Sequence, residues 1–396
     1  MYTLKLETAA KARVVADDMI LTKGVATAAG SKMLQGFESL FSSEALTRLE
    51  NAGYGLCGKS RVGEFALDLM GETAFDGALV VDGVLKNGAA EVLSAKEADV
   101  ALCLDVNGSC RRAAAQSGLI SIKPTYGTVS RYGTVPVACS GETVSLMADS
   151  VEAVKKALAV VVGHDDKDGT SQSEALCDSV LKNDGTVKRV AVLKNMLVSI
   201  DADVKANIES AIEDLKKNGI EVEEIEGGNI AAAKVAWNIL MCAEMCNNVS
   251  RYDGVKYGHR AQEFSNLDEL YMNSRTEGFG SFLKTAIIFG SETLSTDNYM
   301  KVYDKALRTR RIIVDEFNKL FGEFDAVLMP AVSKSAYTVK DIENDKFMAF
   351  NENFYTAPAS ISGLPAVVSG GVQLVGKAFS ENKLLTVAKL LAKEGK

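Results

Sequence analysis

The chain has 396 residues, of which 47% are hydrophobic and 24% charged, so it can bury a large core. Its formal net charge of −8 argues against direct binding of nucleic acid, because phosphate contacts need clusters of Lys and Arg. No apolar run reaches the roughly 18 residues of a membrane span, and the N-terminal residues lack the apolar segment of a signal peptide. We therefore expect a cytoplasmic protein that does not bind membranes.

In the first half of the chain, three amphipathic segments are each preceded by a small polar or glycine residue and followed by a Gly. A Ser before a helix can accept a hydrogen bond from its first turn, and a Gly after it can adopt the left-handed conformation that ends the helix. The pattern predicts helices over 44–52, 109–117 and 151–162, and strands over 54–57 and 119–123.

The second half continues the alternation of strands and helices. Asp201 precedes an amphipathic helix that closes at Gly219, with strands expected on either side at 188–193 and 220–225. Further on we expect a long helix over 297–320, a strand over 326–329 and a last helix over 381–393. The alternation predicts an α/β fold with a mixed central sheet flanked by helices on both faces. We expect one domain over 1–396, with 187–290 as an inserted smaller subregion.

The seven cysteines have no spacing typical of a disulfide framework, and their number is odd, which is typical of reduced thiols. Cys242 and Cys246 lie four residues apart on one predicted helix, but the chain contains only two histidines. We therefore expect no zinc site at this pair, no other metal and no cofactor.

The segment 107–133 carries the strongest functional signal in the chain. The turn Asn107-Gly108-Ser109 opens a short helix, and the first N–H groups of a helix favour a developing negative charge. Ser109 is therefore a candidate nucleophile beside a backbone oxyanion hole. The alternative is that Ser109 only caps the helix.

The Lys-Pro-Thr-Tyr-Gly run at 123–127 resembles the signature region of the amidase-signature family, and further motifs of that family occur along the chain. These motifs are most similar to those of the A subunits of glutamine-dependent amidotransferases that act on Asp-tRNA(Asn) and Glu-tRNA(Gln). They stand at 22–34, 49–67, 163–171, 250–261, 274–280 and 362–366. The resemblance implies the fold of that family, a glutamine or related small amide as ligand, and B- and C-type subunits as partners.

The resemblance also implies a catalytic triad of a Ser nucleophile, a second Ser and a Lys, and two of these are replaced. Asp17 stands where the family has the Lys, and Leu85 stands where it has the second Ser. A leucine cannot carry a proton, and an aspartate is a weak base at neutral pH unless burial raises its pKa. Ser109 is the only triad member that remains.

The binding positions are partly kept. Val106, Asn107 and Gly108 stand where the family has Thr-Gly-Gly in its oxyanion hole. Arg310 matches the Arg that binds the glutamine carboxylate, although a solvated helix face is the alternative for its charge. Asn353 replaces an Asp that binds the glutamine amino group, which removes a charge-assisted hydrogen bond worth about 1.5–3 kcal/mol.

These replacements favour a pseudo-amidase that acts as a non-catalytic or weakly catalytic partner in an amidotransferase-like assembly. Two alternatives remain open. One is an active Ser-dependent amidohydrolase or glutaminase in which another base activates Ser109 and which supplies ammonia for Gln-tRNA or Asn-tRNA formation. The other is a protein that binds a small amide or amino acid without chemistry.

Overall fold

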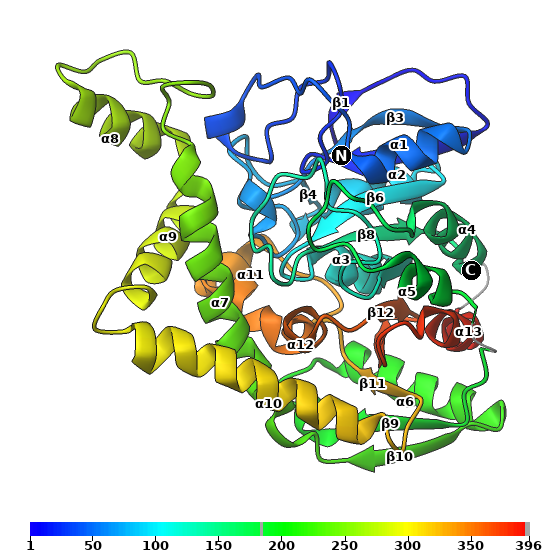
Figure 1. The fold of residues 1–396 in the computed structure, drawn as a ribbon. Coiled ribbons are helices and arrows are strands. Elements are labelled where there is room, and N and C mark those ends of the chain that lie inside the picture. The colour runs from blue at the N-terminus through cyan, green and yellow to red at the C-terminus, as the bar shows by residue number, and fades with distance from the viewer. Residues whose placement is uncertain (183–184, 393–396) are drawn as a thin grey trace.

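A mixed sheet of eleven strands runs through the molecule in the computed structural model, which describes residues 1–182 and 185–392 (Figure 1). Its strand order is β1-β3-β2-β6-β8-β7-β12-β13-β11-β9-β10. Neighbouring strands pair in parallel at β3-β2-β6 and at β11-β9-β10, and in antiparallel fashion elsewhere. The predicted mixed α/β architecture is confirmed.

The strands of this sheet are short, with four to seven residues each. They are β1 Tyr2–Lys5, β2 Ala12–Asp17, β3 Tyr54–Ser60, β6 Val100–Asp105, β7 Ile120–Lys123, β8 Thr143–Ala148, β9 Arg189–Leu193, β10 Glu221–Ile225, β11 Ala326–Met329, β12 Ala366–Ser369 and β13 Val372–Gly376. A separate small hairpin is formed by β4 Val80–Val81 and β5 Val84–Leu85.

Helices cover both faces of the sheet (Figure 1). They are α1 Glu44–Asn51, α2 Gly88–Ser94, α3 Ser109–Ser117, α4 Val151–Val161, α5 Glu174–Ser179, α6 Ala202–Lys217, α7 Ala233–Asn248, α8 Leu267–Gly278, α9 Ser281–Thr293, α10 Asp304–Leu320, α11 Val339–Asn344, α12 Met348–Ser362 and α13 Glu381–Leu391.

Alternating strand residues separate the core into two hydrophobic clusters. Val14 and Ala16 of β2 point to the cluster that includes α1, α4 and α13, whereas Val15 points to the cluster that includes α2 and α3. Side chains of a strand alternate between its two faces, so both clusters are built from the same strands. The cluster of α2 and α3 is the face on which Ser109 lies.

Capping residues begin the helices where the sequence predicts. The Asp201 side chain accepts a hydrogen bond from the Val204 N–H at 2.8 Å at the start of α6, and Ser43 and Ser150 cap α1 and α4 in the same way. The strand β11 has the predicted bounds. The predicted last helix ends at Leu391, and residue 393 lies outside the described residues.

Two elements differ from the prediction. The strand predicted over 54–57 continues to Ser60, because β3 pairs with β1 on one side and with β2 as far as Asp17 on the other. The helix predicted from 297 begins instead with a π-helical turn, Tyr299–Tyr303, before α10.

The segment from β9 to β10 extends the main sheet through parallel pairing. The inserted subregion predicted at 187–290 stays a prediction. Among the described residues, every helix is too short or too polar to cross a bilayer.

Candidate active site

Ser109 is the first residue of α3, directly after the turn that follows β6. Gly108 is the capping residue, with φ +93°, and no side chain caps this helix. A Cβ atom on Gly108 would lie 2.4 Å from Cβ of Thr356, so the turn needs a glycine both for its left-handed backbone and for the contact with α12. The alternative that Ser109 is only the helix cap is wrong.

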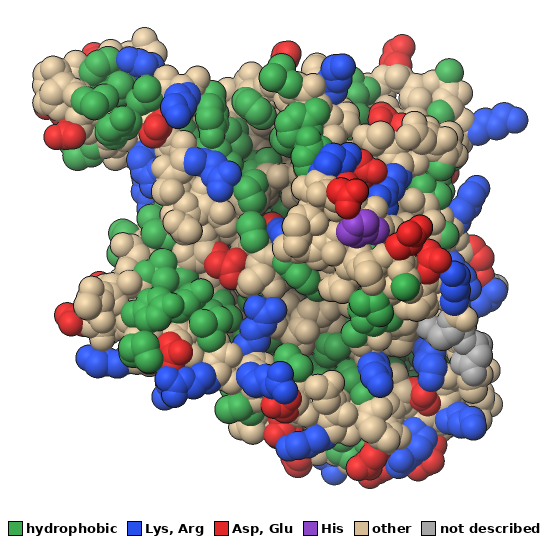
Figure 2. All heavy atoms as spheres, in the orientation of Figure 1, with side chains coloured by type: hydrophobic (Ala, Val, Ile, Leu, Met, Phe, Trp, Pro, Cys, Tyr) green, Lys and Arg blue, Asp and Glu red, His purple; other side chains and the backbone are tan. Residues whose placement is uncertain are grey.

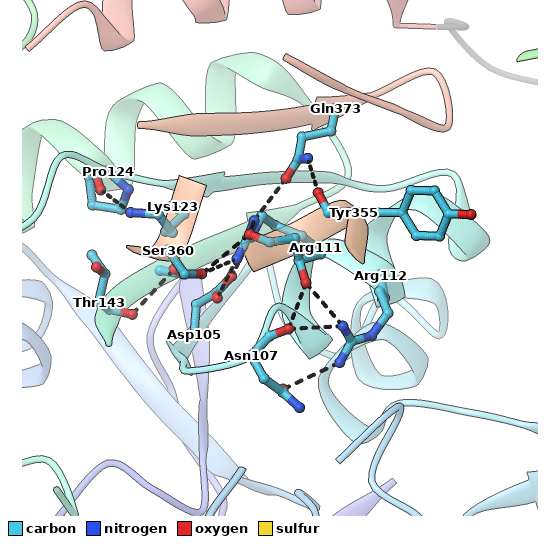
Figure 3. Close-up of polar contacts among 12 residues, drawn as sticks. Asp105, Asn107, Arg111, Arg112, Lys123, Pro124, Thr143, Tyr355, Ser360 and Gln373 are labelled. Carbon is cyan, nitrogen blue, oxygen red and sulfur yellow. Dashed lines mark hydrogen bonds and ion pairs between the residues drawn. The ribbon is translucent and has the colours of Figure 1, made fainter. Parts of the chain in front are cut away.

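The residues that precede Ser109 are held from both sides. The Asn107 side chain donates to the Asp68 carbonyl at 2.8 Å, and the Asn107 carbonyl accepts from Thr356 at 2.8 Å and Arg112 at 2.9 Å. Figure 3 shows Arg112 directed at Asn107. Val106 is fully buried. At the oxyanion-hole positions, the larger Asn107 side chain therefore fills space against the chain that contains Asp68.

Arg111, one turn into α3, fixes the helix in the core (Figure 3). Its guanidinium donates to both carboxylate oxygens of Asp105, at 2.8 and 2.9 Å, and all atoms of both side chains are buried. It also donates to the Thr356 carbonyl, the Gln373 side chain and the Ser360 hydroxyl, each at 2.8 Å. The end of β6, the start of α3 and α12 are thereby joined in one hydrogen-bonded network.

A very small cavity, about 10 Å³ in volume, lies beside Ser109. It offers room for roughly one water molecule, and Ser109 itself is only 5% exposed. The residues that line it include Asp17, Ser60, Asp68, Cys103, Cys110 and Ser109. A larger cleft of about 730 Å³ is lined by Glu64, Glu72 and three phenylalanines, but Ser109 is not among its lining residues.

The structure places Asp17 at the end of β2 and on the wall of the Ser109 cavity. Its carboxylate accepts hydrogen bonds from the Leu104 N–H at 2.7 Å and the Met19 N–H at 3.0 Å. Burial raises the pKa of Asp17 to about 7, against the effect of these bonds and of the nearby Lys59 ammonium. The Lys59 side chain donates to the Ile20 carbonyl, and its own pKa is lowered by burial.

Leu85 is buried but does not line the Ser109 cavity. It lies in β5, its backbone N–H donates to the Tyr337 carbonyl at 2.8 Å, and it belongs to the same hydrophobic cluster as Tyr337. Asn87 and Ala89, two and four residues further on, do line the cavity. The segment at Leu85 thus approaches the site without contributing a polar group to it.

Arg310 and Asn353 are not among the residues that line the cavity at Ser109. Arg310, on α10, donates to the Ser140 carbonyl at 3.1 Å. Asn353, on α12, is fully buried and donates to the Asn238 side chain at 2.7 Å, while its own side-chain oxygen has no hydrogen-bond partner. Both side chains are held by other parts of the protein.

Sequence reasoning missed Asp68, a carboxylate on the cavity wall that interacts with the Ser109 hydroxyl. Burial raises the pKa of Asp68, opposed by the Gly63 N–H, Arg112 and the Ser109 hydroxyl. One signal was present, because Asp68 is the single charged residue in the run Phe-Ala-Leu-Asp-Leu-Met at 65–70.

Two thiols lie close to Asp17. The ligand atoms of Asp17, Cys103 and Cys110 are all within 4.8 Å of one another, and the three side chains are buried. A hydrogen bond with Cys103, together with burial, raises the pKa of the Cys110 thiol well above its ordinary value. These three residues are the group with metal-ligand chemistry among the described residues.

Comparison with known proteins relates this fold and site to one family. The Amidase family model matches residues 17–385. The chain is 34% identical to the A subunit of glutamyl-tRNA(Gln) amidotransferase from Lachnoclostridium phytofermentans, over 94% of this chain and 81% of that protein. It is 35% identical to the same subunit from Latilactobacillus sakei, over 93% and 79%. The fold of the corresponding Thermotoga maritima protein matches with a TM-score of 0.81 at 24% identity, over 99% of this chain and 86% of that chain.

Proposed function

Since the chain belongs to the amidase family, we propose that it is a pseudo-amidase, which keeps the fold of its relatives and has lost their hydrolytic chemistry. In this proposal it acts as a non-catalytic or weakly catalytic partner in an amidotransferase-like assembly. Its relatives are named as subunits of glutamyl-tRNA(Gln) amidotransferase, which supports a role inside a larger enzyme.

The observation that carries the proposal is the size of the cavity at Ser109. A volume of about 10 Å³ accommodates a water molecule but not a side-chain amide, because small-molecule sites in proteins enclose roughly 300–1,000 Å³. A nucleophile must approach the substrate carbonyl within hydrogen-bond distance of its base. With Ser109 only 5% exposed, this closed arrangement leaves no room for glutamine next to the hydroxyl.

The groups around Ser109 also favour loss of activity. At the position of the family Lys, Asp17 accepts two backbone hydrogen bonds, which stabilise its ionised form and hold its oxygens away from proton transfer. A negative charge there would oppose an oxyanion forming nearby. Leu85 contributes no proton relay, and the Asn107 side chain narrows the oxyanion-hole turn.

Exposed hydrophobic side chains supply a surface for subunit contact. Figure 2 shows two groups of them, over α8 and over the turn between α9 and α10. Met272 on α8, Ile288 on α9 and Met300 in the π-helical turn are 60%, 70% and 60% exposed. Contiguous apolar surface of this kind marks contact with other proteins. We propose B- and C-type amidotransferase subunits as the partners, with any tRNA bound by a partner rather than by this acidic chain.

The first test is co-expression of the full chain with B- and C-type subunits from the same genome, followed by size-exclusion chromatography and an assay of ammonia release from glutamine. The proposal expects a stable complex that releases no ammonia above the uncatalysed rate. An active relative, assembled with its own partners, is the positive control. A chain that stays monomeric with both subunits present contradicts the proposed partners.

A second candidate function rests on Asp68. A buried carboxylate with a raised pKa beside a serine hydroxyl has the chemistry of a general base, so Ser109 and Asp68 form an alternative catalytic pair. In that case ammonia release disappears in Asp68→Asn and in Ser109→Ala alike. The pseudo-amidase instead gives the same background signal for the natural protein and both variants.

A further inference from the structure

We propose that Asp17, Cys103 and Cys110 form a binding site for a single zinc ion beside Ser109. Their ligand atoms lie within 4.8 Å of one another, so a point exists about 2.8 Å or less from all three. A zinc–sulfur bond is about 2.3 Å and a zinc–carboxylate bond about 2.0–2.2 Å. Shifts of roughly half an ångström in the side chains therefore close the coordination shell.

The three ligands come from three rigid elements of the core. Asp17 ends β2, Cys103 lies in the neighbouring strand β6, and Cys110 is the second residue of α3. The strands β2 and β6 pair in parallel, and α3 packs on the same face of the sheet. Ligands on regular elements hold a metal geometry more accurately than ligands on loops.

The small cavity supplies the fourth coordination position. It touches all three ligands and is lined on its other side by Ser60, Asp68 and Ser109. The Ser60 hydroxyl and one carboxylate oxygen of Asp68 are buried without a hydrogen-bond partner. Buried polar atoms are normally paired, so these two are placed to accept from, or donate to, a water bound to the ion. Three protein ligands with one water position is the arrangement of an open zinc site.

The surroundings orient the carboxylate ligand and balance its charge. The backbone N–H groups of Leu104 and Met19 bind the two oxygens of Asp17, and outer contacts of this kind fix the direction of a ligand. Each oxygen keeps a lone pair for the metal. Zinc with two thiolates and one carboxylate carries one negative charge, and the buried Lys59 ammonium interacts with Asp17.

The donor set selects the metal by its chemistry. Two thiols exclude Mg²⁺ and Ca²⁺, which require oxygen ligands, whereas Zn²⁺ takes sulfur and carboxylate oxygen together in tetrahedral geometry. Binding replaces the two thiol protons by zinc–sulfur bonds and releases them to solvent, with no change of oxidation state. This site does not depend on the proposed function, because zinc binds here whether or not Ser109 hydrolyses an amide.

The test uses the full chain, purified in reducing buffer without chelators, and measures bound zinc by mass spectrometry of the metal. We expect about one zinc per chain. Replacing zinc with Co²⁺ should give the thiolate charge-transfer absorption of a tetrahedral cobalt site. Loss of even an outer contact lowers metal affinity about 10–100-fold, so Cys103→Ser and Cys110→Ser should each reduce the affinity for Co²⁺ at least tenfold.

Cys242→Ser is the matched control, because Cys242 is a buried thiol that is not part of the cluster, and it should keep the full cobalt absorption. X-ray absorption at the zinc edge of the natural protein gives an answer even if a variant fails to fold. Two sulfur neighbours and lighter ligands support the proposal. A natural protein without zinc and without the charge-transfer band, or a band unchanged in both variants, overturns it.

Discussion

Replacing Asp105 by Asn should destabilise the protein by about 3–5 kcal/mol, the range found when one partner of a buried ion pair is removed. The change keeps the shape of the side chain and removes only its charge. Burial by itself would raise the pKa of Asp105, but Arg111 holds it below its ordinary value, so the carboxylate is ionised at neutral pH. The Asn variant therefore leaves the Arg111 guanidinium in the core without a counter-charge.

The contacts of Arg111 give the same magnitude. Of its five hydrogen bonds, the three to Thr356, Gln373 and Ser360 go to neutral groups and remain. The loss is the attraction between two unit charges about 4 Å apart, which is about 4 kcal/mol at an effective dielectric constant of about 20. Arg112 and Lys123 also interact favourably with Asp105, so the Asn variant leaves three cations less well compensated.

The assay is urea unfolding followed by fluorescence, with Asp149→Asn as the control. Asp149 pairs with Lys96 at 2.9 Å, but their side chains are 48% and 69% exposed, and exposed pairs contribute about 0–1 kcal/mol. The two variants remove the same charge from pairs of similar length, so only burial separates them. If Asp105→Asn costs no more than Asp149→Asn, the argument that this network anchors the Ser109 helix is wrong.

Two further predictions concern the stability of the site region. Gly108→Ala should cost about 2–5 kcal/mol, from a left-handed alanine and a clash with Thr356, whereas Gly36→Ala, at φ +78° with no atom within 4 Å, should cost only the backbone strain of about 1–2 kcal/mol; equal losses in urea unfolding would rule out the clash. Burial raises the pKa of Glu64 from 4.5 to about 7, so its protonated form is favoured by folding, and the stabilisation is complete below pH 4.5 and lost as the pH rises through 7. Between pH 5 and 8 this group should lower the free energy of unfolding by up to about 3 kcal/mol, and Glu64→Gln should remove that part of the pH dependence, so an unchanged slope would contradict it.

Local signals in the sequence predict much of the fold. Asp201 and Gly219 mark the ends of α6 because side-chain capping and a left-handed glycine, at φ +77°, act within a few residues. The extension of β3 to Ser60 has no such signal, since it depends on pairing with β1 and β2. Pairing between strands distant in sequence is a tertiary effect that overrides local preference.

The site divides in the same way. Ser109, Gly108 and Asn107 are adjacent in sequence, so their turn could be predicted from composition alone. Asp68 and Cys103 reach the cavity from other segments, and their approach to Ser109 depends on how the sheet is assembled. Neither residue stands in a motif, and the only signal was a polar or reactive side chain inside an apolar run.

The central claim is that Ser109 no longer hydrolyses an amide, and the most direct measurement compares ammonia release from glutamine by the natural chain and by Ser109→Ala. Both proteins should be assayed alone and with B- and C-type subunits, at equal concentration. The closed cavity and the replaced triad predict equal rates, indistinguishable from glutamine in buffer. A turnover of about 1 s⁻¹ or more, typical of enzymes, that is lost in Ser109→Ala would contradict the pseudo-amidase.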